Sequence, residues 1–290
     1  MISDLKKICI GSANFGSYYG YKSSKIKKKE FSKIFKYLKQ KKIHYIDTAI
    51  NYKNSEKIIG KYNKNFKIIT KIPNVPKSEK NPKKWIQKKI LDSLKNLKCK
   101  KLYGVLFHHP PYEYKRINFL AIIKYLEYLR RKKIIKKIGI SAYTLDQIKR
   151  SFSIYNFQIV QFQMSVLDQN IYKSKLVNRL KKNNVEIHVR SIFLQGMLLS
   201  KLKNIPNKFN YLKKKIKFFE NWVAKKKITR LEACLRFVIY SNFVDKVIIG
   251  TNNYSQLKET ISTIQKISNK IYLPKKLKKL NSYTLNPSNW

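Results

Sequence analysis

This sequence predicts an α/β fold, namely a (β/α)8 TIM barrel with a parallel eight-stranded core. Three observations lead to this prediction. Eight short apolar, β-branched runs alternate with amphipathic runs along the chain. Most of the short runs are apolar on both faces, as the strands of a buried parallel sheet are. The length of 290 residues is close to the ~250 that is typical of such a barrel.

The expected elements follow one another in barrel order. Strands are predicted at 7–14, 44–49, 66–72, 102–109, 137–143, 159–165, 186–192 and 245–251. The clearest helices are predicted at 30–41, 82–97, 118–133, 145–155, 174–184 and 230–241. The lysine-rich stretch 202–217 is predicted to be a long connection over the barrel mouth. Because no linker-like segment or change in composition divides the chain, we expect a single domain, 1–290.

An open, doubly wound sheet is the alternative architecture. A nucleotide-binding sheet of that kind carries a G-x-G-x-x-G turn directly after its first strand. The stretch GSANFGSYYG, which follows the first apolar run here, does not have this spacing. The barrel is therefore favoured.

The charge of the chain is extreme, with 65 Lys and Arg against 15 Asp and Glu and a formal net charge of +50. One interpretation is that the protein binds nucleic acid or another acidic surface. The other is codon bias, because Lys, Ile, Asn and Tyr are all abundant and all have AT-rich codons. The lysines are spread over every predicted helix and no nucleic-acid motif is present, so we expect no specific nucleic-acid partner.

The cysteine spacing and the hydropathy of the chain indicate its cellular location. Cys9, Cys99 and Cys234 are widely spaced, without the spacing of a metal site or an even disulfide framework. No metal is therefore expected, and a reducing, cytoplasmic setting is predicted. No segment approaches ~18 consecutive apolar residues and the N-terminus lacks a signal-peptide pattern, so no membrane association is expected. The sequence does not indicate an oligomeric state.

Polar side chains occur at the ends of three consecutive predicted strands. Asp47 ends the second strand and Tyr52 follows it, Lys71 ends the third, and His108 ends the fourth. Barrel enzymes carry their chemistry at these carboxyl ends, and neighbouring strands lie about 4.8 Å apart. We therefore expect the four side chains to converge.

Together these residues have the composition of a proton-transfer site. A free tyrosine has a pKa of about 10, which a nearby ammonium such as that of Lys71 would lower. Asp47 would balance the buried lysine, and His108 would orient a carbonyl oxygen or relay a proton. Tyr52 would then be the general acid. Each residue alone also fits a structural role, as a cap, a packed ring, a surface cation or a core histidine, but their joint occurrence at strand ends favours a site.

Seven motifs in a fixed order extend the pattern over residues 10–260. They are IDTAINYKNSEKIIG, IITKI, VLFHHP, IGISAY, VQFQMSVLDQN, RSIFLQGML and VIIGTNNYSQLKE. In these motifs the chain resembles the aldo-keto reductase family, and the RSxFLQGxL piece looks most like bacterial members. The resemblance implies a TIM barrel, an extended nicotinamide cofactor bound without a Rossmann motif, and carbonyl reduction. It also implies a catalytic set of Asp47, Tyr52, Lys71 and His108.

The same resemblance implies cofactor-binding residues. The carboxamide would be held by Ser141 and Gln161. The nicotinamide ring and diphosphate would be flanked by Arg190, Ser191 and Gly196. The adenosine end would be held by Gly250, Thr251, Asn253, Gln256 and Glu259. Independently of the resemblance, the spacing of Asn253 and Gln256 predicts a helix N-cap, and a helix N-terminus after the last barrel strand commonly binds phosphate.

The motifs depart from the family pattern in three places. Ala142 stands where many members have an asparagine that faces the carboxamide, and Lys53 replaces a common glycine. Gly250 and Gln256 stand where NADPH-selective members often have Lys and Arg, which a 2′-phosphate prefers. We expect NADP(H) as the cofactor, with NAD(H) as the alternative.

The function predicted from the sequence is that of an NAD(P)H-dependent oxidoreductase. It would reduce an aldehyde, ketone or sugar carbonyl of a small-molecule substrate, with Tyr52 as the general acid. The alternative is a non-catalytic regulatory module of the same fold that binds a nicotinamide. An intact set of four polar residues favours the enzyme, because a binding module needs neither Tyr52 nor Lys71.

Overall fold

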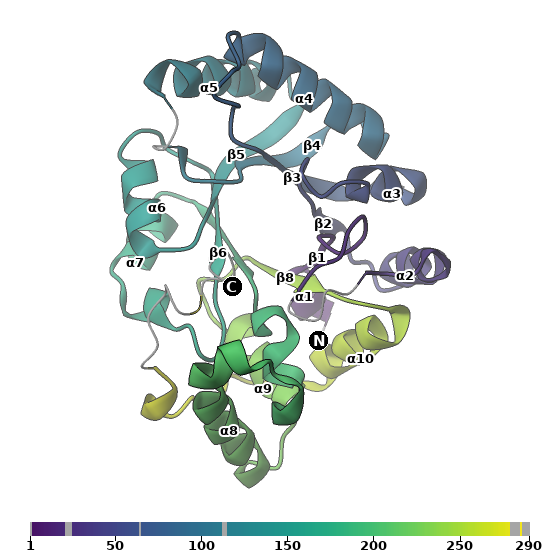
Figure 1. The fold of residues 1–290 in the computed structure, drawn as a ribbon, viewed down its shortest axis with the longest axis vertical. Helices are drawn as coiled ribbons and strands as arrows, with labels where there is room; N and C mark the ends of the chain where they lie inside the picture. Colours follow the sequence, from purple (N-terminus) through teal and green to yellow (C-terminus); the bar gives the residue numbers. More distant parts are fainter. Residues whose placement is uncertain (1, 21–24, 64, 112–114, 279–284, 286–290) are drawn as a thin grey trace.

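The chain folds into a closed barrel of eight parallel strands, as the sequence predicts. A computed structural model describes residues 2–20, 25–63, 65–111, 115–278 and 285. Each strand pairs with the next along the chain, and β8 pairs with β1 to close the barrel. Helices surround the strands (Figure 1).

Every predicted strand segment overlaps an observed strand, and β5 begins two residues before its predicted start. The strands are β1 (Ile8–Gly11), β2 (Tyr45–Asp47), β3 (Lys67–Ile72), β4 (Leu102–Phe107), β5 (Ile135–Ala142), β6 (Ile159–Gln163), β7 (Glu186–Arg190) and β8 (Lys246–Gly250). Most of them end earlier than predicted, because the polar residues at their carboxyl ends leave the hydrogen-bonded ladder and enter loops.

The six predicted helices are also confirmed, and further helices accompany them. The helices are α1 (Ile2–Leu5), α2 (Lys28–Gln40), α3 (Ser55–Tyr62), α4 (Pro82–Leu97), α5 (Arg116–Arg131), α6 (Leu145–Phe152), α7 (Leu176–Lys182), α8 (Asn210–Lys225), α9 (Arg230–Ile239) and α10 (Tyr254–Lys266). Within the described ranges, none of these helices has the length and apolar character needed to cross a lipid bilayer.

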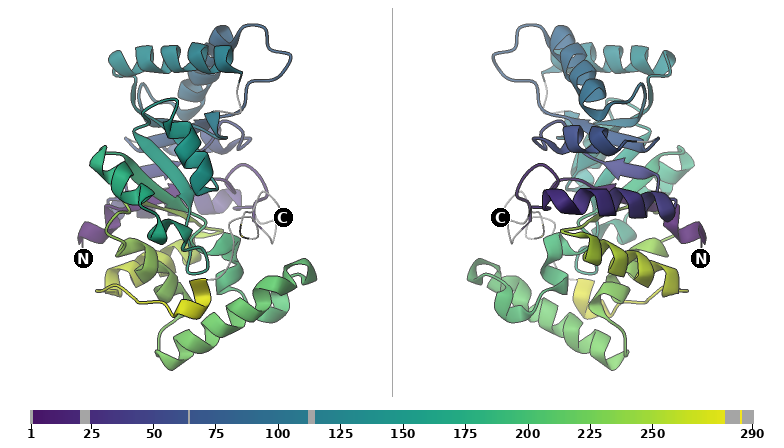
Figure 2. Two further views of the ribbon diagram at one scale, coloured as in Figure 1. Left: turned by 90° about the vertical axis from the view of Figure 1, so that its left-hand side faces the viewer. Right: turned by 90° about the vertical axis from the view of Figure 1, so that its right-hand side faces the viewer.

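The stretch 202–217, predicted as one long connection, contains helical structure that the prediction missed. It consists of two short 3₁₀ turns, Leu202–Asn204 and Asn207–Phe209, followed by the first half of α8. Helix α8 forms because its apolar residues lie on one face at spacings of four and three; these buried residues are Leu212, Ile216, Phe219 and Val223. The helix packs against α9 and projects beyond the barrel (Figure 2).

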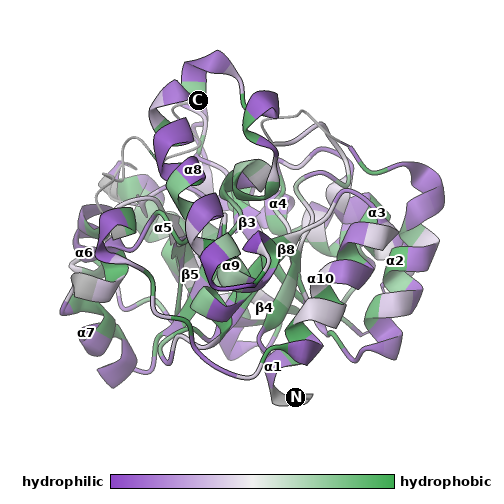
Figure 3. Ribbon diagram, turned by 90° about the horizontal axis from the view of Figure 1, so that it is seen from below, coloured by the Kyte–Doolittle hydropathy of each residue, from purple (hydrophilic) through white to green (hydrophobic). Residues whose placement is uncertain are grey.

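The barrel interior is apolar in one layer and polar in the next. The apolar layer consists of Cys9, Ile69, Leu106, Ile159 and Ile248. Side chains two residues apart on a strand share a face. Lys71 follows Ile69 by two residues and Gln161 follows Ile159 by two, so both also point into the barrel, in the next layer toward its carboxyl end. Outside the barrel, the helices turn hydrophobic residues toward the strands and hydrophilic ones outward (Figure 3).

Candidate active site

A buried ion pair lies at the carboxyl end of the barrel. The Lys71 ammonium donates to Asp47 Oδ1 at 2.5 Å and to the carbonyl oxygen of Thr48 at 2.9 Å. The second carboxylate oxygen of Asp47 accepts a 2.7 Å hydrogen bond from Gln161 Nε2. The side chains of Lys71 and Asp47 are only 1% and 6% exposed. At that depth either charge alone would be strongly unfavourable, so each requires the other.

Tyr52 and His108 complete a group of four side chains. The Tyr52 ring centroid lies 5.3 Å from Lys71 Nζ. The Tyr52 ring also meets the His108 ring edge-on, with centroids 5.7 Å apart and planes at 78°. The structure therefore brings together Asp47, Tyr52, Lys71 and His108, which come from β2, the turn after it, β3 and the end of β4.

The turn that carries Tyr52 is held by hydrogen bonds on both sides. The Tyr52 N–H donates to the carbonyl of Ala49 at 3.0 Å, and the Tyr52 carbonyl accepts from the N–H of Ser55 at 2.9 Å. The buried Ser55 hydroxyl donates to Ser12, on the loop after β1. Lys53, the residue that replaces a common glycine, adopts a left-handed φ of 45°, which explains why glycine suits this position.

Gly16 lets the loop after β1 pack directly against this turn. A Cβ atom at Gly16 would lie 2.5 Å from Ser55 N, 2.6 Å from Asn54 N and 2.7 Å from the carbonyl oxygen of Tyr52. All three are backbone atoms, so no side-chain rotation can relieve the overlap. Gly16 is thus a positioning residue for Tyr52.

Replacing Gly16 with Ala is therefore expected to move the Tyr52 turn. Because a shift of about 1 Å can cost 10²-fold in rate, we expect kcat of a reaction that depends on Tyr52 to fall by about 10- to 100-fold. Steady-state kinetics measures this loss. Tyr18→Ala is the control, since Tyr18 lies in the same loop and is 71% exposed. Equal rates for Gly16→Ala and the wild type would contradict the positioning role.

The pKa of Tyr52 is raised, which is opposite to the direction expected from the sequence. Burial of the phenol is the largest cause, and the Asp47 carboxylate adds to it, whereas the Arg190 guanidinium lowers the pKa. Asp47 neutralises Lys71 within the ion pair, so the lysine does not act as an isolated cation. Tyr52 is therefore a neutral phenol at neutral pH, and it could give its proton only to a strongly basic oxygen.

His108 is neutral in this site. Burial, followed by the nearby charge of Lys71, lowers the pKa of His108 to about 2. Its Nδ1 atom is buried and has no hydrogen-bond partner among the described residues. A neutral imidazole donates from one ring nitrogen, so His108 can donate a hydrogen bond to an oxygen placed near Tyr52.

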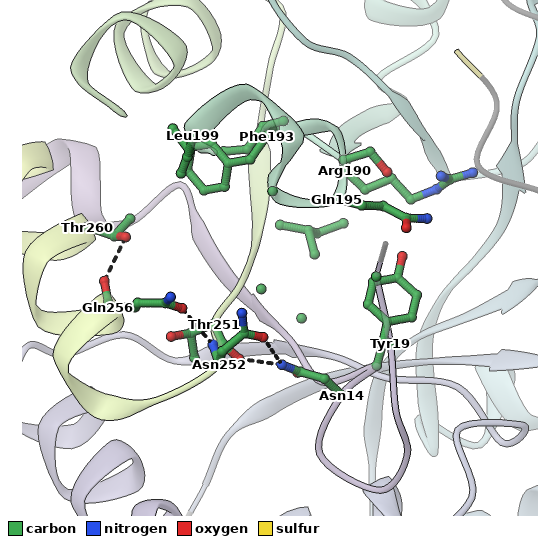
Figure 4. A pocket seen from close by; sticks show the side chains of 18 of the residues that line it. Asn14, Tyr19, Arg190, Phe193, Gln195, Leu199, Thr251, Asn252, Gln256 and Thr260 are labelled. Carbon is green, nitrogen blue, oxygen red and sulfur yellow. Dashed lines mark hydrogen bonds between the residues drawn. The ribbon is translucent and has the colours of Figure 1, made fainter. Parts of the chain in front are cut away.

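A cavity of about 710 Å³ opens beside these residues. Asp47 and Tyr52 lie in its wall, and the cavity runs from them past the segment after β7 toward the N-terminus of α10. Figure 4 shows Arg190, Gln195 and Tyr19 at one end and Thr251, Gln256 and Thr260 at the other. The predicted cofactor residues in its wall are Arg190, Ser191, Gly196, Gly250, Thr251, Gln256 and Glu259.

The segment after β7 bends sharply to form part of this wall. Ser191, Leu194 and Gln195 have φ values of 57°, 48° and 54°, and Gly196 has a φ of 96°. Only glycine adopts this last conformation without strain, which accounts for Gly196 in the RSIFLQG motif.

Ser141 and Gln161, predicted to hold a carboxamide, lie deeper than the cavity wall. They are register partners on β5 and β6 and are 3% and 0% exposed. Gln161 Nε2 is bound to Asp47, but Gln161 Oε1 is buried without a partner among the described residues. An orphaned buried acceptor at this place is matched by the amide N–H₂ of a nicotinamide, so these residues fit the cofactor.

The N-terminus of α10 has the predicted cap. Asn253 Oδ1 accepts from the N–H of Gln256 at 2.9 Å, which confirms Asn253 as the N-cap residue. Gln256 Oε1 accepts from the N–H of Asn252 at 3.0 Å, and Glu30 Oε2 accepts from the N–H of Tyr254 at 2.8 Å. The side chain of Asn253 is thus used within the protein, and a carboxylate already lies at the end of the helix.

Sequence reasoning missed several residues of the cavity wall. Asn14 and Tyr19 follow β1, and Asn14 Nδ2 bridges to Asn252 Oδ1 at 3.0 Å and to the carbonyl of Thr251. Lys201 and Arg230 come from the region between β7 and β8. Asn14 has a signal in the sequence, because it is a polar residue at the end of a predicted strand. The others depend on how long loops fold.

Comparisons with known proteins place this geometry in context. The model of the aldo/keto reductase family matches residues 7–272. Among solved structures, the holo form of aldo-keto reductase AKR11C1 from Bacillus halodurans matches with a TM-score of 0.71 and 19% identity, covering 91% of this chain and 87% of that one. PA4992 from Pseudomonas aeruginosa matches with a TM-score of 0.63 and 17% identity, covering 89% of each chain. No curated protein matches.

Proposed function

The chain belongs to the aldo/keto reductase family, and from that premise we propose that it reduces a carbonyl group of a small molecule with a nicotinamide cofactor. The observation that carries the proposal is the convergence of Tyr52, His108 and the Lys71–Asp47 pair beside one cavity. The substrate would be an aldehyde, a ketone or a sugar carbonyl.

Tyr52 and His108 would act on the carbonyl oxygen from two sides. The neutral His108 donates a hydrogen bond that orients and polarises the oxygen. Tyr52 delivers its proton as negative charge develops on that oxygen, which typically contributes 10²- to 10⁴-fold in rate by general acid catalysis, as an order of magnitude. The Lys71–Asp47 pair fixes the floor of the site, and Arg190 offsets the rise in the pKa of Tyr52.

The cofactor would lie along the cavity. Its carboxamide would contact Ser141 and Gln161, its diphosphate the segment after β7, and its adenosine the wall made by Gly250, Thr251, Gln256 and Glu259. When bound, the reduced nicotinamide supplies a hydride to the carbonyl carbon. The surrounding wall of the cavity would hold the ring next to Tyr52 and keep water away.

The charges at the adenosine wall argue against a strong preference for NADP(H). The cations that line the cavity within the described residues are Arg190, Lys201 and Arg230, and none comes from β8 or α10. Glu259 lines that wall, and Glu30 lies at the end of α10. A 2′-phosphate would therefore find no cationic partner on β8 or α10. The sequence predicted NADP(H) as the cofactor, with NAD(H) as the alternative. From the charges of this wall we expect NADH to bind at least as tightly as NADPH, which a fluorescence titration with each cofactor measures. A clear preference for NADPH would contradict this expectation.

A direct assay separates the enzyme from the alternative, a non-catalytic nicotinamide-binding module. Purified protein is mixed with reduced cofactor and a reactive aromatic aldehyde, and the absorbance of the reduced cofactor is followed. An enzyme makes the absorbance fall, whereas a module that only binds leaves it constant.

We further propose a cytoplasmic location, which the free cysteines Cys9, Cys99 and Cys234 support.

A further inference from the structure

Asp168 is a buried acid near the mouth of the barrel that the proposed reaction does not use. It lies in a tight turn after β6, where its N–H donates to the carbonyl of Ser165 at 3.0 Å and to Ser165 Oγ at 3.1 Å. The Ser165 N–H donates in return to the carbonyl of Asp168 at 3.2 Å. Asp168 is only 6% exposed. A carboxylate at this depth requires hydrogen bonds or an opposite charge.

The Asp168 carboxylate has hydrogen-bond donors on two sides. Asn170 Nδ2 donates to Asp168 Oδ1 at 2.9 Å, and the Asn170 N–H and the Gln163 side chain also bind the carboxylate. Burial is the largest influence and raises the pKa of Asp168 to about 6, although these donors oppose it. Asp168 is therefore ionised at neutral pH and takes up a proton in mildly acidic solution.

Arg190 ends β7 next to this turn. The Met164 N–H donates to the carbonyl of Arg190 at 3.1 Å. Gln163 and Arg190 are register partners, so their side chains point to the same face of the barrel. The Arg190 guanidinium donates to the carbonyl of Ala142 at 3.2 Å and lies 4.2 Å from the centroid of the Tyr143 ring. Figure 4 shows this side chain directed away from the adenosine wall.

The charge of Arg190 links Asp168 to the site. Acting through space, the guanidinium favours the ionised form of Asp168 and lowers the pKa of Tyr52. Attraction between charges is mutual, so the Asp168 carboxylate also attracts the guanidinium. Arg190 is the charged group, among the described residues, that acts on Asp168. The other contacts of the guanidinium are one carbonyl and one ring face, both neutral.

We propose that Asp168 is a positioning residue, whose ionised carboxylate holds the Arg190 guanidinium against the Tyr143 ring in the orientation that binds the nicotinamide cofactor. This inference rests on the proposed function and adds a residue that touches neither cofactor nor substrate. Without the carboxylate, the flexible Arg190 side chain keeps only its two neutral contacts and turns more freely. A proton on Asp168 has the same effect, so cofactor binding is coupled to pH through this pair.

Calorimetric titration with NAD⁺ in a double-mutant cycle tests the positioning role. At about pH 7.5, where Asp168 is ionised, we expect Asp168→Asn to raise the Kd of NAD⁺ about five- to tenfold, a usual size for residues that share one network. In an Arg190→Met background the same substitution should change the Kd by less than about twofold, because the group that Asp168 positions is gone. A turn with a merely structural role would lose equally in both backgrounds.

The pH dependence tests the same link without altering Asp168. As the pH falls from about 7.5 to about 5, Asp168 takes up a proton, so the Kd of NAD⁺ for the wild type should rise toward that of Asp168→Asn. Both Asp168→Asn and Arg190→Met should lack this rise. The comparison with Arg190→Met therefore decides the matter even if Asp168→Asn does not fold. Asp146→Asn is the matched control, because the Asp146 side chain is 71% exposed, and it should behave like the wild type.

The outcomes separate this inference from the proposed function. If no nicotinamide dinucleotide binds to the wild type, the proposed function fails. If NAD⁺ binds but Asp168→Asn binds it equally well, or loses as much affinity in both backgrounds, the positioning role is overturned while carbonyl reduction stands. Tighter binding by Asp168→Asn would also overturn it, since the carboxylate would then only weaken the attraction of Arg190 for the cofactor diphosphate.

Discussion

Replacing Tyr52 with Phe is expected to lower kcat for aldehyde reduction by about 10²- to 10⁴-fold, the usual contribution of a general acid. The substitution removes the hydroxyl but keeps the ring that packs beside Lys71 and His108. Cofactor binding, followed by fluorescence quenching, should survive because the residues proposed to hold the cofactor lie mainly away from Tyr52. The loss should therefore lie in kcat and not in the dissociation constant of the cofactor.

Tyr128→Phe is the matched control for this experiment. Tyr128 lies on α5 and is 46% exposed, so removing its hydroxyl should leave kcat within a few-fold of the wild type. Turnover by Tyr52→Phe at the wild-type rate would show that another group protonates the oxygen.

Replacing Lys71 with Met is expected to lower both stability and activity. The change leaves the Asp47 carboxylate buried, with Gln161 as its one remaining side-chain hydrogen-bond partner among the described residues. Breaking a buried pair on one side typically costs about 3–5 kcal/mol in the free energy of unfolding. Urea denaturation measures this loss, and steady-state kinetics measures the loss of turnover.

The double variant Asp47→Asn with Lys71→Met separates the two effects. Because both charges are removed together, we expect most of the free energy of unfolding to return. Turnover should stay low, since the electrostatic environment of Tyr52 is altered. A single Lys71→Met variant as stable as the wild type would mean that Asp47 carries no unbalanced charge in the folded protein.

The barrel itself was predictable because its strands have a simple pattern. Runs such as LYGVLF in β4 and KVIIG in β8 are short and largely apolar on both faces, as the strands of a covered parallel sheet are. Helix α8 was missed although Leu212, Ile216, Phe219 and Val223 have helical spacing. The many lysines between these positions obscured that spacing.

The convergence of the four polar side chains was predictable for a geometric reason. A closed barrel brings the carboxyl ends of all strands to one rim, so Asp47, Lys71 and His108 had to lie near one another. The pKa direction of Tyr52 was not predictable, because it depends on burial and on the pairing of Lys71 with Asp47.

Contacts that depend on loop conformation or side-chain rotamers could not be predicted from the residue pattern of the sequence. The contact of Gly16 with the Tyr52 turn depends on how the segment after β1 folds back. The stacking of Arg190 on Tyr143 depends on side-chain rotamers at two strand ends.

The most direct test of carbonyl reduction uses a cofactor that carries deuterium at the transferable position of the reduced nicotinamide. The protein is mixed with this cofactor and an aldehyde in ordinary water, and the alcohol is analysed by mass spectrometry. The site predicts deuterium on the former carbonyl carbon and a solvent-derived proton on the oxygen. Aldehyde recovered unchanged, or alcohol without deuterium on carbon, would contradict it.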